Sequence, residues 1–331
     1  MKLRLRAGLI PAVLTSLILA SCHSGDPIGT NPPPSGPAWT PVQSGTAAPL
    51  NAVWGSSATD AWTVGGAGGA AVIVHYNGTS WGSSWTSPTT ATWYLFGVWG
   101  LSATNVWAVG YSAGLGATLH YDGTTWTSVP TSTNQIMVGI WGASASDIWA
   151  VGGGNAGTIL HYDGTAWSTV PSGTTPTLLA VWGNSATDIW VVGIAGTMLH
   201  YNGTSWSSVA SGTTADLVGI WGTSASDIWA VGGNASLGGT GGMILHYNGT
   251  AWSRVTSGTN LDLFSVWGTS ASNVWAVGDS GIILHFDGTG WSSGTTSGTT
   301  TFLDGVWGSS ATDVWLVGGA GTILHGPPTG P

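Results

Sequence analysis

Histidine and aspartate recur through this sequence at regular spacing, and both residue types can do chemistry. One His stands near the end of each of seven similar segments: His75, His120, His161, His200, His246, His285 and His325. An acidic residue precedes it in five of them, at Asp60, Asp147, Asp188, Asp227 and Asp313, and Asn105 and Asn273 take that place in the other two. A His can bind a metal ion, or act as a general base that a carboxylate orients.

The sevenfold repetition argues against both kinds of site. Each His would lie on a different repeat unit, at the same distance from a common axis. Such side chains cannot converge on one ion with tetrahedral geometry. A catalytic triad needs a nucleophile within reach of the base, and no Gly-x-Ser-x-Gly motif offers one. No Gly-Lys-Ser/Thr follows Gly-rich segments such as Val64–Ala70. We therefore predict that the seven His are structural, with no metal and no cofactor.

The elements that carry these residues form a repeat of about forty residues. The pair Trp-Gly marks each copy, at Trp54, Trp99, Trp141, Trp182, Trp221, Trp267 and Trp307. One copy divides into strand A at Leu178–Gly183, strand B at Asp188–Gly193, strand C at Gly196–Tyr201, an Asn-Gly turn, and strand D from Trp206. A period near forty with four strands per unit is typical of a β-propeller.

Composition supports an all-β fold. The chain has 23 Trp and 55 Gly, and no Glu, while Val, Ile, Thr and Trp dominate the periodic segments. Three Trp per unit account for 21 of the 23, and at this periodicity we expect most of them in the core. The prediction is a seven-bladed β-propeller with four antiparallel strands in each blade.

The two ends of the repeat complete each other. The seventh unit has strands A, B and C but no D, whereas residues 38–55 align with residues 166–183 and begin with a D-like strand. An N-terminal strand is therefore expected to close the last blade, because an open array would leave both end strands unpaired. This places the propeller at residues 38–326 and a C-terminal tail at 327–331.

The first residues predict export. A basic start at Lys2, Arg4 and Arg6 precedes an apolar run and the sequence Leu-Ala-Ser-Cys, which ends at Cys22. This ending resembles the lipobox of bacterial lipoproteins, which implies a signal peptide at 1–21 and lipidation of Cys22. The alternative is an ordinary signal peptide with a chance Cys. Residues 22–37, rich in Pro, Gly and Ser, then form a tether. His23 after the Cys favours the outer membrane of the bacterial cell envelope.

Charge excludes one class of partner. After Cys22 the chain holds a single basic residue, Arg254, and thirteen Asp, so its formal charge there is −12. Proteins that bind nucleic acid need Lys and Arg to displace the counterions of phosphates. We therefore predict no nucleic-acid binding, and no binding to anionic lipid head groups.

The repeat resembles those of known propeller families. The stretch Ile189–Trp206, IWVVGIAGTMLHYNGTSW, is similar to repeats of bacterial neuraminidases and photosystem II assembly factors, and most similar to repetitive secreted propellers of myxobacteria. Here the Asp/Asn, Gly and Trp lie one residue closer than an Asp-box requires. The resemblance implies three Arg and a Tyr/Glu pair for a sialidase, or an Arg patch for an assembly factor. This chain has neither set, so those activities are not expected.

Departures from the repeat indicate a binding site. Three extra residues between Trp81 and Leu95 bring Trp85, Trp93 and Tyr94, and the B–C loop at Gly232–Met243 is also long. Loops D–A and B–C emerge on the same face of a propeller, where scaffolds of this kind bind ligands. The alternative is that Trp85 and Trp93 only pack against neighbouring blades.

The function predicted from these observations is non-enzymatic binding or scaffolding by a monomeric, lipid-anchored, surface-displayed propeller. Its partner would be an envelope protein. A lectin-like propeller that binds a glycan is the alternative, because exposed Trp and Asp suit sugars. A hydrolase or lyase with an unrecognised site is the least favoured hypothesis.

Overall fold

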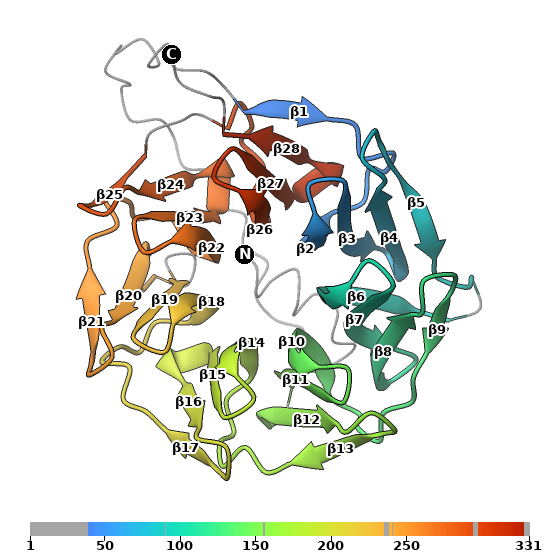
Figure 1. The fold of residues 1–331 in the computed structure, drawn as a ribbon, viewed down its shortest axis with the longest axis horizontal. Helices are drawn as coiled ribbons and strands as arrows, with labels where there is room; N and C mark the ends of the chain where they lie inside the picture. The colour runs from blue at the N-terminus through green and yellow to red at the C-terminus, as the bar shows by residue number, and fades with distance from the viewer. Residues whose placement is uncertain are drawn as a thin grey trace.

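In a computed structural model the chain forms a ring of seven four-stranded sheets around one axis (Figure 1). The structure describes residues 39–327, except 90, 155, 235–237, 240 and 294–296. The predicted signal peptide, Cys22, the whole tether at 22–37 and residues 328–331 of the predicted tail lie outside the described residues. The seven-bladed all-β fold is confirmed.

Blades 1 to 4 follow the order of the chain. Blade 1 holds β2 (Leu50–Ser57), β3 (Asp60–Ala67), β4 (Ala70–Tyr76) and β5 (Trp81–Thr86). Blade 2 holds β6 (Trp93–Ser102), β7 (Asn105–Ser112), β8 (Leu115–Tyr121) and β9 (Trp126–Ser128). Blade 3 holds β10 (Ile136–Ser144), β11 (Asp147–Gly153), β12 (Thr158–Tyr162) and β13 (Trp167–Val170). Blade 4 holds β14 (Leu178–Ser185), β15 (Asp188–Gly193), the 3-10 turn η1 (Ile194–Gly196), β16 (Met198–Tyr201) and β17 (Trp206–Ser208).

Blades 5 to 7 complete the ring. Blade 5 holds β18 (Leu217–Ser224), β19 (Asp227–Gly232), β20 (Met243–Tyr247) and β21 (Trp252–Val255). Blade 6 holds β22 (Leu263–Ser270), β23 (Asn273–Gly278), the 3-10 turn η3 (Asp279–Gly281), β24 (Ile283–Phe286) and β25 (Trp291–Ser292). Blade 7 holds β26 (Leu303–Ser310), β27 (Asp313–Gly318), the 3-10 turn η4 (Gly319–Gly321), β28 (Ile323–Gly326) and, from the start of the chain, β1 (Thr40–Val42).

Strand β1 closes the ring as predicted. It pairs antiparallel with β28, with Thr40 opposite His325 and Val42 opposite Ile323, so the two ends of the repeat lie side by side (Figure 1). The preceding Trp39 is buried and packs edge-on against Trp275 of blade 6, with ring centroids 5.5 Å apart. In blade 4 the D-strand Trp206 makes the same edge contact with Trp149 of blade 3, also at 5.5 Å.

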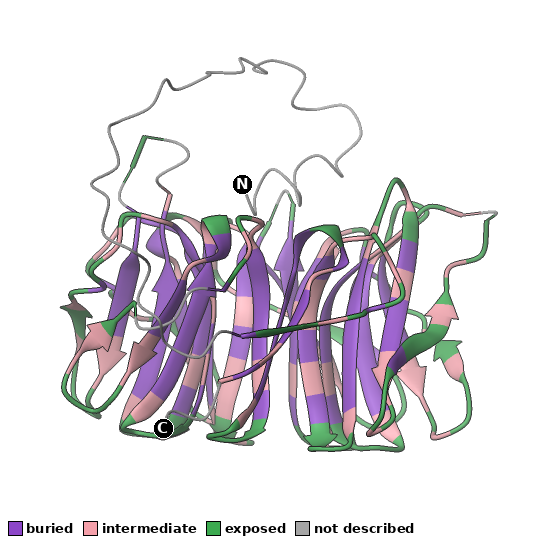
Figure 2. Cartoon of the chain, turned by 90° about the horizontal axis from the view of Figure 1, so that it is seen from above, coloured by how far each residue is buried: buried purple, intermediate pink, exposed green. Residues whose placement is uncertain are grey.

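The hydrophobic core lies between neighbouring blades rather than in one central mass. One such cluster joins Trp149 and Ile159 of blade 3 to Leu178, Ile189 and other residues of blade 4. Viewed from the side, buried residues fill the middle of the strands and exposed residues gather at the two rims (Figure 2). Each blade therefore depends on its neighbours for burial, as in other repeat proteins.

The Trp-Gly pair links one blade to the next. A Cβ added at Gly100 of blade 2 would lie 2.5 Å from Cη2 of Trp54 in blade 1. The same relationship joins every neighbouring pair, and Trp307 of blade 7 packs on Gly55 of blade 1. Only Gly leaves room for the indole of the preceding blade at this position.

A β-bulge recurs near the start of every inner strand. In blade 4, Leu178 lies opposite Gly193 and Ala180 opposite Val192, so Leu179 is an extra residue without a partner in the ladder. Bulges re-aim a side chain and are common beside binding sites. The bulge residues of the seven blades are Asn51, Phe96, Val138, Leu179, Val218, Phe264 and Asp304.

Within the described part of the chain, no helix is long and apolar enough to cross a membrane.

Candidate functional site

The repeated His and Asp meet within each blade, at the rim formed by the A–B and C–D turns. Each Asp begins strand B and each His lies near the end of strand C, so antiparallel pairing brings them together. The His Nε2 to Asp Oδ1 distance is 2.6–2.8 Å in the five blades that have Asp. Each imidazole also stacks on the strand-B Trp of its own blade, with centroids 3.9–4.3 Å apart.

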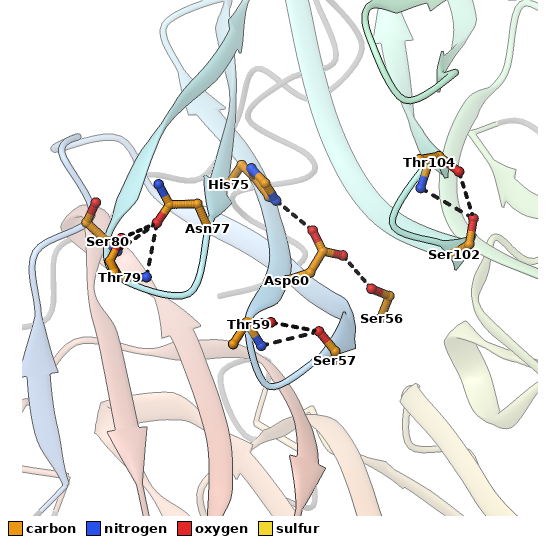
Figure 3. Close-up of polar contacts among 10 residues, drawn as sticks. All are labelled: Ser56, Ser57, Thr59, Asp60, His75, Asn77, Thr79, Ser80, Ser102 and Thr104. Carbon is orange, nitrogen blue, oxygen red and sulfur yellow. Dashed lines mark hydrogen bonds and ion pairs between the residues drawn. The ribbon is translucent and has the colours of Figure 1, made fainter.

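The hydrogen bonds of this cluster run in an order that does not suit catalysis. In blade 1, Ser56 Oγ donates to Asp60 Oδ2 at 2.6 Å, and His75 Nε2 lies 2.7 Å from Asp60 Oδ1 (Figure 3). The carboxylate thus sits between the hydroxyl and the imidazole. A general base must instead lie between the nucleophile and the orienting carboxylate. The arrangement ties the A–B turn to strand C.

Two blades carry Asn in place of Asp and differ electrostatically. Asn105 Oδ1 lies 3.1 Å from His120 Nε2, and Asn273 Oδ1 lies 2.6 Å from His285 Nε2. Burial lowers the pKa of both His120 and His285 below the usual range of histidine, and the nearby Asp122 and Asp287 oppose that shift. These two imidazoles therefore favour the neutral form.

The acidic residues of the C–D hairpin turns cap their own loops. Asp163 Oδ1 accepts hydrogen bonds from the Thr165 hydroxyl and from the backbone N–H groups of Thr165 and Ala166. These bonds lower the pKa of Asp163 to about 2, and similar bonds do the same for Asp122 and Asp287. These carboxylates are engaged in turn formation. No three His, Cys, Asp or Glu side chains gather as metal ligands among the residues that the structure describes.

The three aromatic residues singled out in the sequence lie at the junction of blades 1 and 2. Trp85 belongs to β5 and Trp93 begins β6, so both lie in strands rather than in the expected loop. Their rings meet edge-on, with centroids 5.5 Å apart, and both pack against the core cluster shared by these blades. All three residues, Tyr94 included, are half-buried. Trp85 and Trp93 thus support the fold while they remain partly exposed.

The insertion lengthens the inner hairpin of blade 2. Trp93 lies opposite Ser112 and Tyr94 opposite Tyr111, two pairs beyond the Leu95–Gly110 pair. The equivalent pair is the first in blades 1, 4, 5, 6 and 7, and blade 3 has one pair before it. Directly opposed residues share one face of a sheet and neighbours alternate. Tyr94 and Tyr111 therefore share one face of this extension, and Trp93 lies on the other.

Two residues at this place were not predicted from the sequence. Leu115 at the start of β8 lies opposite Ser112 and is 53% exposed, unusual for so large an apolar side chain here. Tyr111 is half-buried beside Tyr94. The longer B–C segment of blade 2 was the signal that could have revealed them. We call Trp85, Trp93, Tyr94, Tyr111 and Leu115 the aromatic ledge.

The long B–C loop of blade 5 adds no described residue to the candidate site. The B–C loop at Gly232–Met243 lies on the same rim as the aromatic ledge, but residues 235–237 and 240 are outside the described residues. The candidate site therefore rests on blade 2.

Comparison with known proteins gives a likeness of fold. No protein-family model matches the sequence, and no curated protein matches it. The solved structure of YCF48 bound to D1 peptide aligns with a TM-score of 0.70 at 16% identity, covering 89% of this chain and 100% of that one. YCF48 from Cyanidioschyzon merolae aligns with a TM-score of 0.68 at 17% identity, covering 88% of this chain and 99% of that one.

Part of a bacterial extracellular domain shares the same architecture. The extracellular domain of the one-component system BT4673 from B. thetaiotaomicron aligns with a TM-score of 0.65 at 13% identity, over 87% of this chain. This chain spans 40% of that ectodomain. At these identities the comparisons show that the chain shares the β-propeller fold of YCF48 and of part of the BT4673 ectodomain.

Proposed function

We propose that this protein is a non-enzymatic binding propeller that holds a segment of a protein partner on the rim formed by its D–A and B–C loops. The observation that carries the proposal is the aromatic ledge, where the repeat is broken and large side chains remain partly exposed. Among the described residues of the other six D–A connections, Phe302 is the single half-buried aromatic side chain. Partly exposed aromatic side chains are frequent anchors of protein interfaces.

The fold comparison supports a peptide as the class of ligand. YCF48 is a propeller of the same architecture whose structure was solved with a D1 peptide. The arginine patch expected of assembly factors has no counterpart here, since Arg254 is the only Lys or Arg after residue 6. The partner of this chain must therefore suit an apolar and acidic surface.

The proposal includes the location. A lipid on Cys22 and the tether at 22–37 would hold a monomeric propeller away from the outer membrane of a bacterial cell, with its rim free to meet an envelope protein. The support is the lipobox-like sequence that ends at Cys22 and the Pro-rich composition after it.

The test compares two exposed leucines. Leu115 is 53% exposed on the aromatic ledge and Leu101 is 47% exposed at the opposite rim, so Leu101→Ala is a matched control for Leu115→Ala. The purified propeller captures its partner from envelope extract, and the captured protein is then titrated with each variant. We expect Leu115→Ala and Tyr111→Ala to weaken binding several-fold, and Leu101→Ala to leave it unchanged.

The same variants separate the alternative. If a glycan array finds a sugar ligand whose binding depends on Leu115 and Tyr111, the ledge serves a lectin rather than a protein-binding propeller. Equal binding of the captured protein by all three variants would place its site elsewhere and overturn the proposal.

A further inference from the structure

The outer strand of blade 1 is longer than the outer strands of the other blades. β5 has six residues, whereas β1, β9, β13, β17, β21 and β25 have two to four. β5 is the last strand of its sheet and lies on the outside of the ring (Figure 1). Among the described strands, it therefore offers the longest free edge on the circumference of the propeller.

Two other blades carry residues that discourage strand addition at this edge. Pro41 of β1 takes the place of Ser83 in β5, one residue after the residue that lies opposite the repeated His. In blade 5 the same place holds Arg254. Proline and charged side chains are common devices that keep a free edge from pairing. β5 has neither, and residues 77–87 carry no charge.

The backbone of Ser83 turns away from the sheet. Antiparallel pairs alternate between residues that exchange hydrogen bonds with the neighbouring strand and residues whose N–H and C=O point outward. At the hairpin turn, the N–H of Asn77 donates to the carbonyl oxygen of Ser80 at 3.3 Å. Counting along β5 from this bonded pair gives Gly82 a bonded position and Ser83 an outward one. Pro41, which has no N–H, fits the equivalent place in blade 7 for the same reason.

A β-bulge in β5 leads its free edge to the aromatic ledge. Ser84 is an extra residue between Ser83 and Trp85 in the ladder with β4. Trp81, before the bulge, packs in the core cluster shared with blade 7, whereas Trp85, after it, packs in the cluster shared with blade 2. Bulges re-aim side chains in this way. A strand laid along β5 would therefore end beside the ring of Trp85.

Gly82 leaves a hollow beside the same edge. In the other six blades the residue opposite the repeated His is Ser or Thr: Thr40, Thr127, Ser168, Ser207, Ser253 and Ser292. A Cβ at Gly82 would meet nothing within 4 Å. The hollow measures about 260 Å³ and is lined by His75, Asn77, Ser80, Gly82, Ser83 and Ser84. Asn77 and Ser80 belong to the turn that joins β4 to β5 (Figure 3).

The size and the lining of the hollow suit one polar side chain. It is smaller than the pockets of about 300–1,000 Å³ that enclose whole ligands. Its wall presents hydroxyl, amide and imidazole groups, which donate and accept hydrogen bonds.

We propose that β5 pairs with an extended strand of the bound partner, and that one polar side chain of this strand enters the hollow at Gly82. The inference rests on the proposed function, because the strand belongs to the protein segment that reaches the aromatic ledge. In strand addition, backbone hydrogen bonds supply affinity and pockets for alternate side chains supply specificity. Ser83 offers the outward backbone groups, and Gly82 the pocket.

Charge indicates the source of the strand. After Cys22 the chain carries thirteen Asp and one Arg, so two copies of this protein would repel each other. The strand therefore comes from a different protein, in a stretch without acidic residues.

The experiment uses a library of random linear peptides, each long enough to span β5, in place of the partner. The library is selected by phage display on the purified protein, and the most enriched peptide is synthesised and titrated by calorimetry. Ser83→Pro should weaken its binding at least about tenfold, because it removes an outward N–H and bars strand pairing. Ser208→Pro, in the equivalent place of β17 in blade 4, is the matched control and should leave affinity within about twofold.

A second variant keeps the test independent of misfolding. Gly82→Ser gives blade 1 the residue type that the other blades carry, so it should leave the thermal midpoint unchanged while it fills the hollow. We expect it to weaken binding of the peptide several-fold. The reverse change in blade 4, Ser207→Gly, should leave binding unchanged.

The peptide itself shows whether a strand is added. N-methylation of alternate residues removes the donors from one edge of an extended peptide. Methylation of the edge that faces β5 should abolish binding, whereas methylation of the other edge should not.

Several results would overturn the proposal. These are a library that yields no binder, unchanged affinity for Ser83→Pro or for Gly82→Ser, and equal effects of methylation on the two edges of the peptide. A dimer in sedimentation that Ser83→Pro converts to monomers would make a second copy of this chain the occupant, against the proposal.

The outcome is distinguishable from that of the proposed function. If the peptide depends on Ser83 and Gly82 but no captured protein depends on Leu115 and Tyr111, the strand site stands and the proposed function fails. If a captured protein depends on the aromatic ledge but binds Ser83→Pro like the unaltered protein, the proposed function stands and strand addition fails.

Discussion

Trp307 of the last blade packs directly on the backbone of Gly55 in the first blade. The contact joins residues 252 positions apart in the chain, and it repeats the contact that each inner Trp makes with the Gly of the following blade. It therefore closes a circle of seven equivalent interactions. Together with the pairing of β1 and β28, it makes the first and last blades neighbours like any others.

Gly55→Ala should destabilise the protein. Its new methyl group would collide with the indole of Trp307 and with the carbonyl oxygen of Asp60, which would lie 2.6 Å from the methyl carbon. Overpacking of this kind costs about 1–3 kcal/mol. Gly82→Ala on the outer strand β5 is the control, since nothing lies within 4 Å of a methyl group there. Urea denaturation measures the stability of the two variants. Equal midpoints for Gly55→Ala and Gly82→Ala would show that the contact between Trp307 and Gly55 does not stabilise the ring.

Weakening the closing strand β1 should lower the stability of the protein as much as weakening the outer strand of another blade. Trp39→Ala deletes a buried indole at the seam, and Trp206→Ala deletes its counterpart inside the ring. Each should lower the free energy of unfolding by about 3–5 kcal/mol. Deletion of residues 38–44 should cost more, and it should broaden the transition because the neighbouring blades lose support. A thermal midpoint for Trp39→Ala equal to that of the unaltered protein would show that the ring is not closed by β1.

Stability should fall as the pH drops below the usual histidine range. Burial lowers the pKa of His120 and His285 in the folded state, so the unfolded chain binds more protons below about pH 6.5. Their contribution is therefore complete above that pH and is lost as the pH falls toward their folded-state pKa. The variant Asn105→Asp/Asn273→Asp gives each imidazole a carboxylate and should show a smaller loss. Thermal midpoints of the unaltered protein and of the double variant are measured at pH 7.5 and pH 5. An equal decrease of the midpoint in the two proteins would refute the prediction.

Cys22→Ala should release the protein from the membrane or leave it uncleaved. Two or more acyl chains give stable attachment, whereas one alone is marginal. Partitioning of whole-cell extract into detergent measures the effect. Ser21→Ala is a suitable control because it keeps a small residue before Cys22. If Cys22→Ala enters the detergent phase like the unaltered protein, the lipobox interpretation is wrong.

Much of the architecture was predictable because its determinants are local in sequence. Each repeat contains the residues that predict its hairpin turns, its strands and the forty-residue period. A count of the strands also shows that the seventh repeat lacks strand D, which the N-terminal segment supplies. The pairing of each His with its Asp or Asn was also within reach. Both residues lie in one blade, so antiparallel pairing of adjacent strands brings them together.

The contacts between blades were decided by the tertiary structure. A repeat pattern identifies Trp307 and Gly55 as equivalent to their counterparts, but only the closed ring places one on the other. The exposed side chain of Leu115 likewise depends on how far the hairpin of blade 2 rises above its neighbours.

A cavity on the axis of the ring shows most clearly which features follow from local sequence and which depend on the tertiary structure. In the sequence, Asn51 and Asp304 are isolated departures from an apolar position near opposite ends of the chain. A bulge in every inner strand turns that position toward the axis, and closure makes blades 1 and 7 adjacent, so the two polar groups share one side of one chamber. Strand patterns follow from interactions between near neighbours along the chain. The polarity of the cavity depends instead on bringing seven distant residues to one axis, which only the folded ring does.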